Sequence, residues 1–331
     1  MIAIVLIAIA AGCASALMFA SVISGALISL LLLYLAPLPL MVAAMGWGSL
    51  CATIGGIAAA IGLGAIFGVP YCIAFAMIVA LPAWWLGHLA LLGRPHHNAQ
   101  NETPPNIIPS GGSVTAEPPA LEWYPVGRIL LWTAGFAIVT TIATLLTLGA
   151  DAAAITSALQ RDLSQMFSGD AAALGQIQPW IDALVKIAPA ATAVIVMMTL
   201  TLNLWLAAKI TATSGRLNRP WPDLKATLLP PMTLVALLVA IAFCFTGGLA
   251  AMLALVIAAA LSMAYALIGF AVLHTLTLAL KNRTFWLSCI YAFVMGFPWL
   301  VSAVAALGLA DAIFQFRQRY LQSRPPPLPA A

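Results

Sequence analysis

Apolar residues fill the chain from Met1 to Gly93, and no Asp, Glu, Lys or Arg interrupts them. A soluble domain cannot carry so long a run, because its surface would be a single apolar patch. About 20 helical residues cross the hydrocarbon core of a bilayer. The run therefore predicts about three membrane-spanning helices, or about four if they are short, and an integral membrane protein.

Small residues recur at every fourth position in two parts of this run. Positions four apart lie on one face of a helix, and small residues let helix backbones approach closely in lipid. The second row covers about 30 Å of helix, so we expect one tightly packed helix from about Leu38 to Phe67. The alternative is that these faces dock against another membrane protein. The first row is Gly12, Ala16, Ala20 and Ser24, and the second is Gly48, Ala52, Gly56, Ala60, Gly64 and Gly68.

Two prolines, Pro37 and Pro39, lie between the two rows. Proline has no backbone N–H to donate and disfavours helix at the residue before it. We therefore expect a sharp break there, followed by a new helix. A further span is expected from about Val69 to Leu91, where Trp84 and Trp85 fit the aromatic belt of a membrane interface.

The longest hydrophilic segment runs from Pro95 to Pro125 and contains seven prolines. Such a composition cannot bury enough apolar surface to fold, so residues 94–126 are predicted to be a disordered linker. Arg94 and Arg128 bracket this segment and favour the cytoplasmic side, where basic residues accumulate.

Between Asp151 and Ile187, apolar residues recur every three or four positions in a polar background. This spacing predicts two amphipathic helices lying on the membrane surface. Ser168-Gly169-Asp170 interrupts the spacing and offers a cap for the second helix. Acidic residues outnumber basic ones here, which favours the outer face.

The remaining apolar runs raise the expected number of spans to about eight, with a range of about seven to nine. Basic residues at Lys281–Arg283 and in the tail both favour the cytoplasm, yet one run separates them. Either Leu249–Leu280 or Phe285–Leu309 is therefore not a simple crossing. The predicted fold class is an all-α, polytopic transmembrane helical bundle. Its parts are N-terminal transmembrane helices (1–93), the linker (94–126), C-terminal transmembrane helices with the surface-helix insertion 151–187 (127–316), and a basic, Pro-rich tail (317–331).

The composition agrees with a membrane protein, since 63% of the residues are hydrophobic and 7% are charged, whereas soluble domains have about 25% charged residues. The formal net charge of +4 needs no nucleic-acid partner, because the positive-inside rule explains it. The five cysteines all lie in apolar spans without a close pair, so neither a disulfide nor a metal site is expected.

A few polar residues stand out as candidates for a functional site. Asn203, Tyr265 and His274 lie inside apolar spans, where polar groups are either functional or serve as hydrogen-bonding links between helices. Asp311 and Arg317 are six residues apart, roughly 120° around a helix, so we expect each to find a partner elsewhere. Trp221 and Pro222, in a short basic loop, form either a stiff elbow or a contact with a partner.

Several short motifs resemble the YybS-like family of bacterial membrane proteins. The resemblance implies a multi-pass protein of the bacterial inner (cytoplasmic) membrane, and it brings no activity or cofactor with it. The residues that carry it are Ala36–Leu40, Gly46–Gly48, Trp221-Pro222, Ala264–His274, Gly308–Asp311 and Phe314–Arg317.

The first half also resembles, more distantly, the substrate-binding membrane subunits of energy-coupling-factor vitamin transporters. The shared features are an alanine-rich first helix, the Pro-Leu-Pro sequence and a helix with regularly spaced glycines. This resemblance implies that Gly12, Ala16 and Ala20 dock a transmembrane coupling subunit. The proline-led helix is similar as well to the rod-shape protein MreD, a scaffold of the cell-wall machinery.

Two hypotheses for the function follow. The first is a small-molecule binding or transport subunit without its own ATPase, because the chain has no Gly-x-x-x-x-Gly-Lys loop. The second is a non-enzymatic membrane scaffold for cell-envelope proteins. An enzyme is not expected, because the spans contain no paired acids, His cluster or Ser/Lys dyad. The expected partners are the lipid bilayer, other membrane proteins and, under the first hypothesis, a small-molecule ligand, with no cofactor and no nucleic acid.

Overall fold

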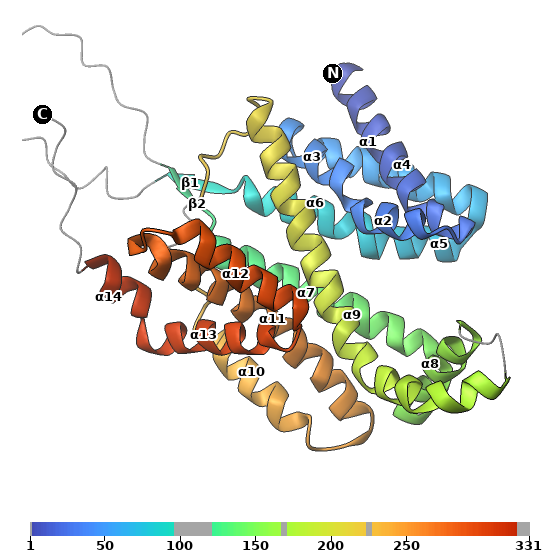
Figure 1. Cartoon of the computed structure of the whole chain (residues 1–331). Coiled ribbons are helices and arrows are strands. Elements are labelled where there is room, and N and C mark those ends of the chain that lie inside the picture. Colours follow the sequence, from blue (N-terminus) through green and yellow to red (C-terminus); the bar gives the residue numbers. More distant parts are fainter. Residues whose placement is uncertain (1, 96–120, 167–170, 223–226, 323–331) are drawn as a thin grey trace, which may run out of the picture.

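The computed structural model describes residues 2–95, 121–166, 171–222 and 227–322. The fold is an all-α bundle of the polytopic membrane class, as predicted. Within the described ranges, seven helices are long and apolar enough to cross a membrane, and two shorter apolar helices accompany them. The long helix α9 (Ala171–Thr213) runs through the middle of the molecule (Figure 1).

The N-terminal half contains four of these candidate spans, Ile2–Ser24, Leu27–Trp47, Ser49–Phe67 and Val69–Ala90. The fourth confirms the span expected from Val69 to Leu91. The elements of this half are α1 (Ile2–Ala20), the 3-10 turn η1 (Ser21–Ser24), α2 (Leu27–Leu35), α3 (Pro37–Trp47), α4 (Ser49–Phe67), α5 (Val69–Phe75), the π turn η2 (Ala76–Ala80) and α6 (Leu81–Ala90).

The single helix predicted from Leu38 to Phe67 is wrong, because the chain breaks at Gly48. Gly48 has φ 94° and ψ 162°, a conformation outside the helical region that glycine adopts at little cost. The new helix expected at Pro37 and Pro39 is confirmed, since α2 ends at Leu35 and α3 begins at Pro37, but the break between them is not sharp. Ala36 keeps helical dihedral angles, and the two prolines lie in the first turn of α3, where their missing N–H groups are tolerated.

The ends of the linker pair with each other, so the prediction that all of residues 94–126 is disordered needs correction. Strand β1 (Gly93–Pro95) runs antiparallel to β2 (Leu121–Trp123), with Gly93 opposite Trp123. Residues 96–120, which carry most of the predicted linker, lie outside the described residues. The two strands bring the end of α6 close to the start of the next helix.

The C-terminal half is built around α9 and a second long helix, α11. The chain enters this half at Val126, directly after the paired strands. Its elements are α7 (Val126–Leu148), α8 (Ala152–Met166), α9, α10 (Met232–Phe243), α11 (Gly248–Leu276), the 3-10 turn η5 (Thr277–Ala279), α12 (Arg283–Gly296), α13 (Leu300–Phe314) and α14 (Phe316–Gln322).

Two helical segments lie between Asp151 and Ile187, as predicted, but only one of them is a separate helix, and their position on a membrane surface stays a prediction. The first is α8, but the second is the beginning of α9, which continues through Pro179 and Pro189 into a membrane span. Ile155 of α8 and Ile181 of α9 are both buried. The two segments therefore pack against each other, and the cap predicted at Ser168-Gly169-Asp170 lies outside the described residues.

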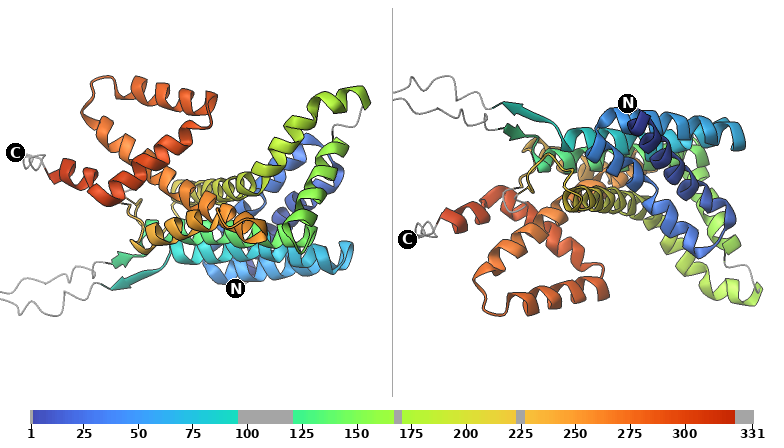
Figure 2. Two further views of the ribbon diagram at one scale, coloured as in Figure 1. Left: turned by 90° about the horizontal axis from the view of Figure 1, so that it is seen from below. Right: turned by 90° about the horizontal axis from the view of Figure 1, so that it is seen from above.

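The last apolar run is not a simple crossing, which was one of the two alternatives from the charge pattern. It folds as α12 and α13, of 14 and 15 residues, joined near Pro298. Helix α12 has no buried residue, and Figure 2 shows it standing apart from the body of the molecule. Two short helices in place of one long span are compatible with basic residues both before and after the run.

The two larger apolar cores both include residues of α9. Leu200 and Ala207 of α9 belong to the core of the N-terminal half, together with residues of α3, α5 and α6. Ala193 and Met197, nearer the N-terminus of the same helix, belong to the core formed with α7, α10 and α11. Helix α9 therefore joins the two halves into one bundle.

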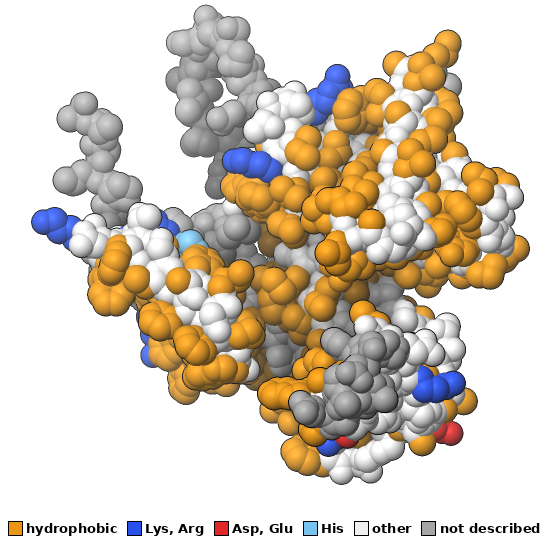
Figure 3. Space-filling model, turned by 45° about the vertical axis from the view of Figure 1, so that its right-hand side comes forward, with side chains coloured by type: hydrophobic (Ala, Val, Ile, Leu, Met, Phe, Trp, Pro, Cys, Tyr) orange, Lys and Arg blue, Asp and Glu red, His pale blue; other side chains and the backbone are white. Residues whose placement is uncertain are grey.

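Charged side chains gather at the two ends of the bundle and leave an apolar band between them (Figure 3). Glu122 of β2 is exposed at one end, and Asp162 of α8 is exposed at the other. Helix α7, with 23 residues, separates them by about 35 Å, close to the thickness of a bilayer core.

This arrangement allows a direct test of the predicted orientation. We expect a cysteine at Asp162 to react with a membrane-impermeant maleimide in intact cells, and a cysteine at Glu122 to react only after lysis. The wild-type chain, with its five native cysteines, provides the background signal. The opposite pattern would show that the linker end faces outward.

Candidate functional site

The small-residue rows pack inside the chain's own bundle. A Cβ atom on Gly12 would overlap the carbonyl oxygen of Gly55, so α1 and α4 touch backbone to backbone. Gly56 faces Ala80, with 3.3 Å between a built Cβ and the Ala80 Cβ. Gly64 faces Cys72 in the same way at 3.0 Å.

Ala52 and Ala60 of the second row are buried, as a packing face requires, but two glycines of that row behave differently from the prediction. Gly48 and Gly68 both have φ 94° and end helices instead of lining a packing face. Ala16 and Ala20 are partly buried against the first core. The face of α1 that contains Gly12 is therefore covered by α4 of the same chain, and Gly12 is not free to dock a partner.

Asn203 links the two halves of the bundle. Its side-chain Nδ2 donates to the carbonyl oxygen of Tyr34 at 2.7 Å and to that of Thr199 at 2.8 Å. Tyr34 lies near the end of α2. The geometry thus supports the interpretation of Asn203 as a hydrogen-bonding link between helices.

Asp311 and Arg317 form a buried ion pair, so the prediction that each finds a partner elsewhere is wrong. Arg317 Nε donates to Asp311 Oδ2 at 2.7 Å, and the Arg317 backbone N–H donates to Asp311 Oδ1 at 3.0 Å. The prediction assumed one continuous helix, but Gln315 adopts a left-handed conformation (φ 55°) that ends α13 and changes the direction of the chain before α14. Arg317 also donates to the carbonyl oxygen of Thr227, so it belongs to the packed structure and not to a solvated tail.

Tyr265 lies in the second core and not in a site. Its side chain is fully buried. A Cβ on Gly308 would overlap the Tyr265 carbonyl oxygen, and a Cβ on Gly269 would overlap that of Val304. Helices α11 and α13 thus cross in backbone contact at Tyr265, which explains its burial by packing alone.

An apolar cavity of about 570 Å³ lies at the linker end of the bundle. We call it the interhelical cavity. Its walls come from α7, α9, α11 and α12, from the loop after α9, and from the ends of α3 and α6. Among the candidates from the sequence it brings together Trp221, Pro222 and His274. Apolar side chains such as Leu130, Leu204 and Leu267 form most of its surface.

A small polar cluster forms one wall of the interhelical cavity. His274 Nε2 lies 2.8 Å from the Tyr291 hydroxyl, and Arg283 Nη2 lies 3.4 Å from His274 Nδ1 and 3.3 Å from the His274 carbonyl oxygen. The Tyr291 ring stacks on Phe270 with ring centroids 5.4 Å apart. The turn between α11 and α12 brings these residues together, since it folds Arg283 back onto the end of α11.

Arg219 also lines the interhelical cavity, where the loop after α9 crosses the paired strands. Its two terminal nitrogens donate to the carbonyl oxygens of Ala90 and Tyr124, at 3.1 and 3.0 Å. Its guanidinium lies over the Trp123 ring, 5.9 Å from the centroid. Burial lowers the pKa of this guanidinium from its ordinary value, and Arg219 still remains a cation at neutral pH.

Sequence reasoning missed three residues of this site, Arg219, Arg283 and Tyr291. Both arginines were counted only as loop charges that set the orientation of the chain. Tyr291 lies in an apolar run, and nothing in the run distinguishes it from an interfacial aromatic residue. The one available signal was the basic turn after His274, because a tight turn returns the next helix to the preceding helix end.

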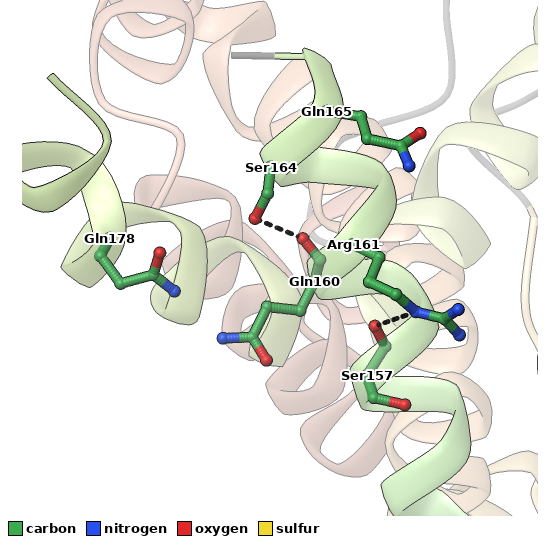
Figure 4. A pocket seen from close by; sticks show the side chains of 6 residues that line it. All are labelled: Ser157, Gln160, Arg161, Ser164, Gln165 and Gln178. Atoms are coloured by element: carbon green, nitrogen blue, oxygen red, sulfur yellow. Dashed lines mark hydrogen bonds between the residues drawn. The ribbon is translucent and has the colours of Figure 1, made fainter. Parts of the chain in front are cut away.

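A second, polar recess lies between α8 and α9 at the opposite end of the bundle (Figure 4). Its hydrogen-bonding groups are engaged locally. Arg161 Nε donates to the Ser157 carbonyl oxygen, and the Gln160 and Gln178 amides both donate to Asp182 Oδ1. These contacts hold α8 and α9 together, so we assign the recess to their packing.

Metal-binding side chains do not gather in the part of the chain that the structure describes, since no three His, Cys, Asp or Glu residues meet there. His96 and His97 lie outside the described residues. The expectation that the protein needs no metal therefore stays a prediction.

Comparisons with known proteins place the chain in no family. No family model matches it, and no curated protein or solved structure matches it either. The resemblances to the YybS-like family, to energy-coupling-factor subunits and to MreD therefore stay predictions from short motifs.

Proposed function

We propose that the protein is a small-molecule binding subunit of the bacterial inner membrane, with its ligand in the interhelical cavity. The cavity's size is the observation that carries this proposal. Its volume of about 570 Å³ falls within the range of about 300 to 1,000 Å³ that is typical of ligand sites. Such sites are mainly apolar with a few convergent polar groups, and this cavity combines leucine side chains with the Arg283–His274–Tyr291 cluster.

The position of the cavity supports a role in capture or transfer of the ligand. It lies where the N-terminal half (Met45, Ala90) meets the C-terminal half (Val126, Trp221). Ligand sites often occur at such junctions, because a small relative movement of two packed parts opens or closes them. The chain has no phosphate-binding loop, so energy for any transport comes from a partner under this proposal.

The membrane-scaffold hypothesis stays a prediction from the sequence. Its main argument was a free ridge of small residues for docking. Gly12 is covered by Gly55, and Gly56 and Gly64 face Ala80 and Cys72 of the same chain. The binding hypothesis is therefore the better supported of the two.

Filling the interhelical cavity tests the proposal. Ala271 of α11 lines it, and an Ala271→Phe variant places a ring inside the cavity. We expect the wild-type protein in phosphatidylcholine nanodiscs to be crosslinked by diazirine-labelled decanol at peptides that line the cavity. Labelling of the Ala271→Phe variant should be at least about fivefold weaker than that of the wild type, because the probe and the phenylalanine ring compete for the same volume.

Ala250→Phe is the matched control, since Ala250 lies on the same helix with an exposed side chain. It should label like the wild type. Equal labelling of the two phenylalanine variants at the cavity peptides would refute the proposal.

A further inference from the structure

The cationic groups of the interhelical cavity are not neutralised within the described structure. Arg219 and Arg283 both line the cavity, and their hydrogen-bond acceptors are backbone carbonyl oxygens and an imidazole nitrogen. Among the described residues, Asp311 and Arg317 form a salt bridge with each other. Neither Arg219 nor Arg283 has a described carboxylate within 4.0 Å. The cavity thus presents two positive charges to an apolar interior.

The guanidinium of Arg283 also has unused hydrogen-bonding capacity. It carries five N–H donors, and its buried Nε has no acceptor. A guanidinium matches the geometry of a carboxylate or phosphate, which accepts two parallel hydrogen bonds from it. The Nε side of the Arg283 guanidinium is therefore suited to an anionic head group.

Arg283 also determines which way the His274–Tyr291 hydrogen bond points. A guanidinium can only donate, so its contact with His274 Nδ1 makes this nitrogen an acceptor and puts the ring proton on Nε2. The Nε2–H group then donates to the Tyr291 hydroxyl oxygen. The proton of the Tyr291 hydroxyl is left to donate to another acceptor, and Tyr291 lines the cavity.

We infer that the interhelical cavity selects amphipathic anions, that is, molecules with an apolar chain and a phosphate or carboxylate head group. The head group binds between the Arg283 guanidinium and the Tyr291 hydroxyl, and His274 positions that hydroxyl. Arg219 adds positive charge to the same cavity. The chain of the ligand lies against the apolar wall near Leu204 and Leu267. This inference rests on the proposed binding function and specifies its ligand class.

Two photoactivatable probes with the same tail test the inference, diazirine-labelled decyl phosphate and diazirine-labelled decanol. In phosphatidylcholine nanodiscs we expect the phosphate probe to label the cavity of the wild type at least about tenfold more than the alcohol. Arg283→Gln should remove this preference and leave the alcohol labelling unchanged. Unchanged alcohol labelling also shows that the variant is folded. Arg319→Gln, on an exposed residue of α14, is the matched control and should keep the preference.

The role of His274 is tested by the same ratio of the two probes. Tyr291→Phe should lower the ratio several-fold, because it removes one donor. His274→Leu should act like Tyr291→Phe, whereas His274→Gln keeps an amide donor and should retain part of the preference. If His274→Leu keeps the wild-type ratio while Tyr291→Phe lowers it, His274 does not position the hydroxyl.

The outcomes separate the inference from the proposed function. Equal labelling by both probes in the wild type, with Ala271→Phe still blocking them, would overturn the anion preference and leave the binding function standing. Labelling that Ala271→Phe does not reduce would overturn both the anion preference and the binding function.

A third arm of the experiment identifies the source of the ligand. Competition by phosphatidic acid in the nanodisc points to a bilayer lipid, and its absence points to a soluble amphipathic anion.

Discussion

Replacing Gly55 by leucine should prevent the N-terminal half from packing. A Cβ atom on Gly55 would overlap the carbonyl oxygen of Ala8, which belongs to the backbone of α1 and cannot rotate away. Helices α1 and α4 must then move apart and lose their mutual dispersion contacts, the main source of helix association in lipid. We expect a loss of about 3 kcal/mol or more, measured as lower folded yield and a lower unfolding temperature in mild detergent.

Gly62→Leu is the matched control for this experiment. Gly62 lies in the same helix, and a Cβ there has no neighbour within 4 Å. Both changes gain the same helix propensity, about 0.8 kcal/mol, so the difference between them reports packing alone. Gly56→Leu should fall between them, because its neighbour is the Ala80 side chain at 3.3 Å. Equal stability of the Gly55 and Gly62 variants would contradict the backbone contact.

This contrast shows how far the sequence could predict the packing of α4. The regular spacing identified a helix rich in small residues, and two of its members, Gly56 and Gly64, do face neighbouring helices. It could not identify Gly55, which points about 100° away from Gly56 toward α1. It also could not separate packing glycines from Gly48, which ends a helix, because both roles favour the smallest residue.

The C-terminal half shows a different limit. Its helices were predictable from apolar runs, and the contradictory charges correctly indicated that one run is not a simple crossing. The site and the buried ion pair were only partly predictable, because each depends on a reversal or bend of the chain. The turn after His274 brings Arg283 and Tyr291 to the cavity, and the left-handed Gln315 brings Arg317 to Asp311. Neither reversal is marked by glycine or proline at the residue that makes it.

Removing the charge of Arg317 should be as damaging as the change at Gly55. Asp311 is 1% exposed, and its carboxylate receives hydrogen bonds from the Arg317 Nε and backbone N–H groups. Arg317→Met leaves this buried carboxylate with the backbone donor alone. Breaking a buried ion pair from one side costs about 3 to 5 kcal/mol. We expect most of the folded protein in detergent to be lost. Size-exclusion chromatography and thermal unfolding measure this loss.

Two further variants separate the ion pair from a general effect of changing α14. Arg319→Met removes a charge from the same helix, but Arg319 is exposed. The free energy of unfolding of this variant should therefore stay within about 0.5 kcal/mol of the wild type. The double variant Asp311→Leu with Arg317→Met removes both buried charges and leaves none stranded. Replacing a whole buried pair by apolar residues is often neutral or stabilising, so the double variant should recover at least half of the loss. If it is as unstable as Arg317→Met alone, the damage comes from lost packing around α14, and the Asp311 charge is not its cause.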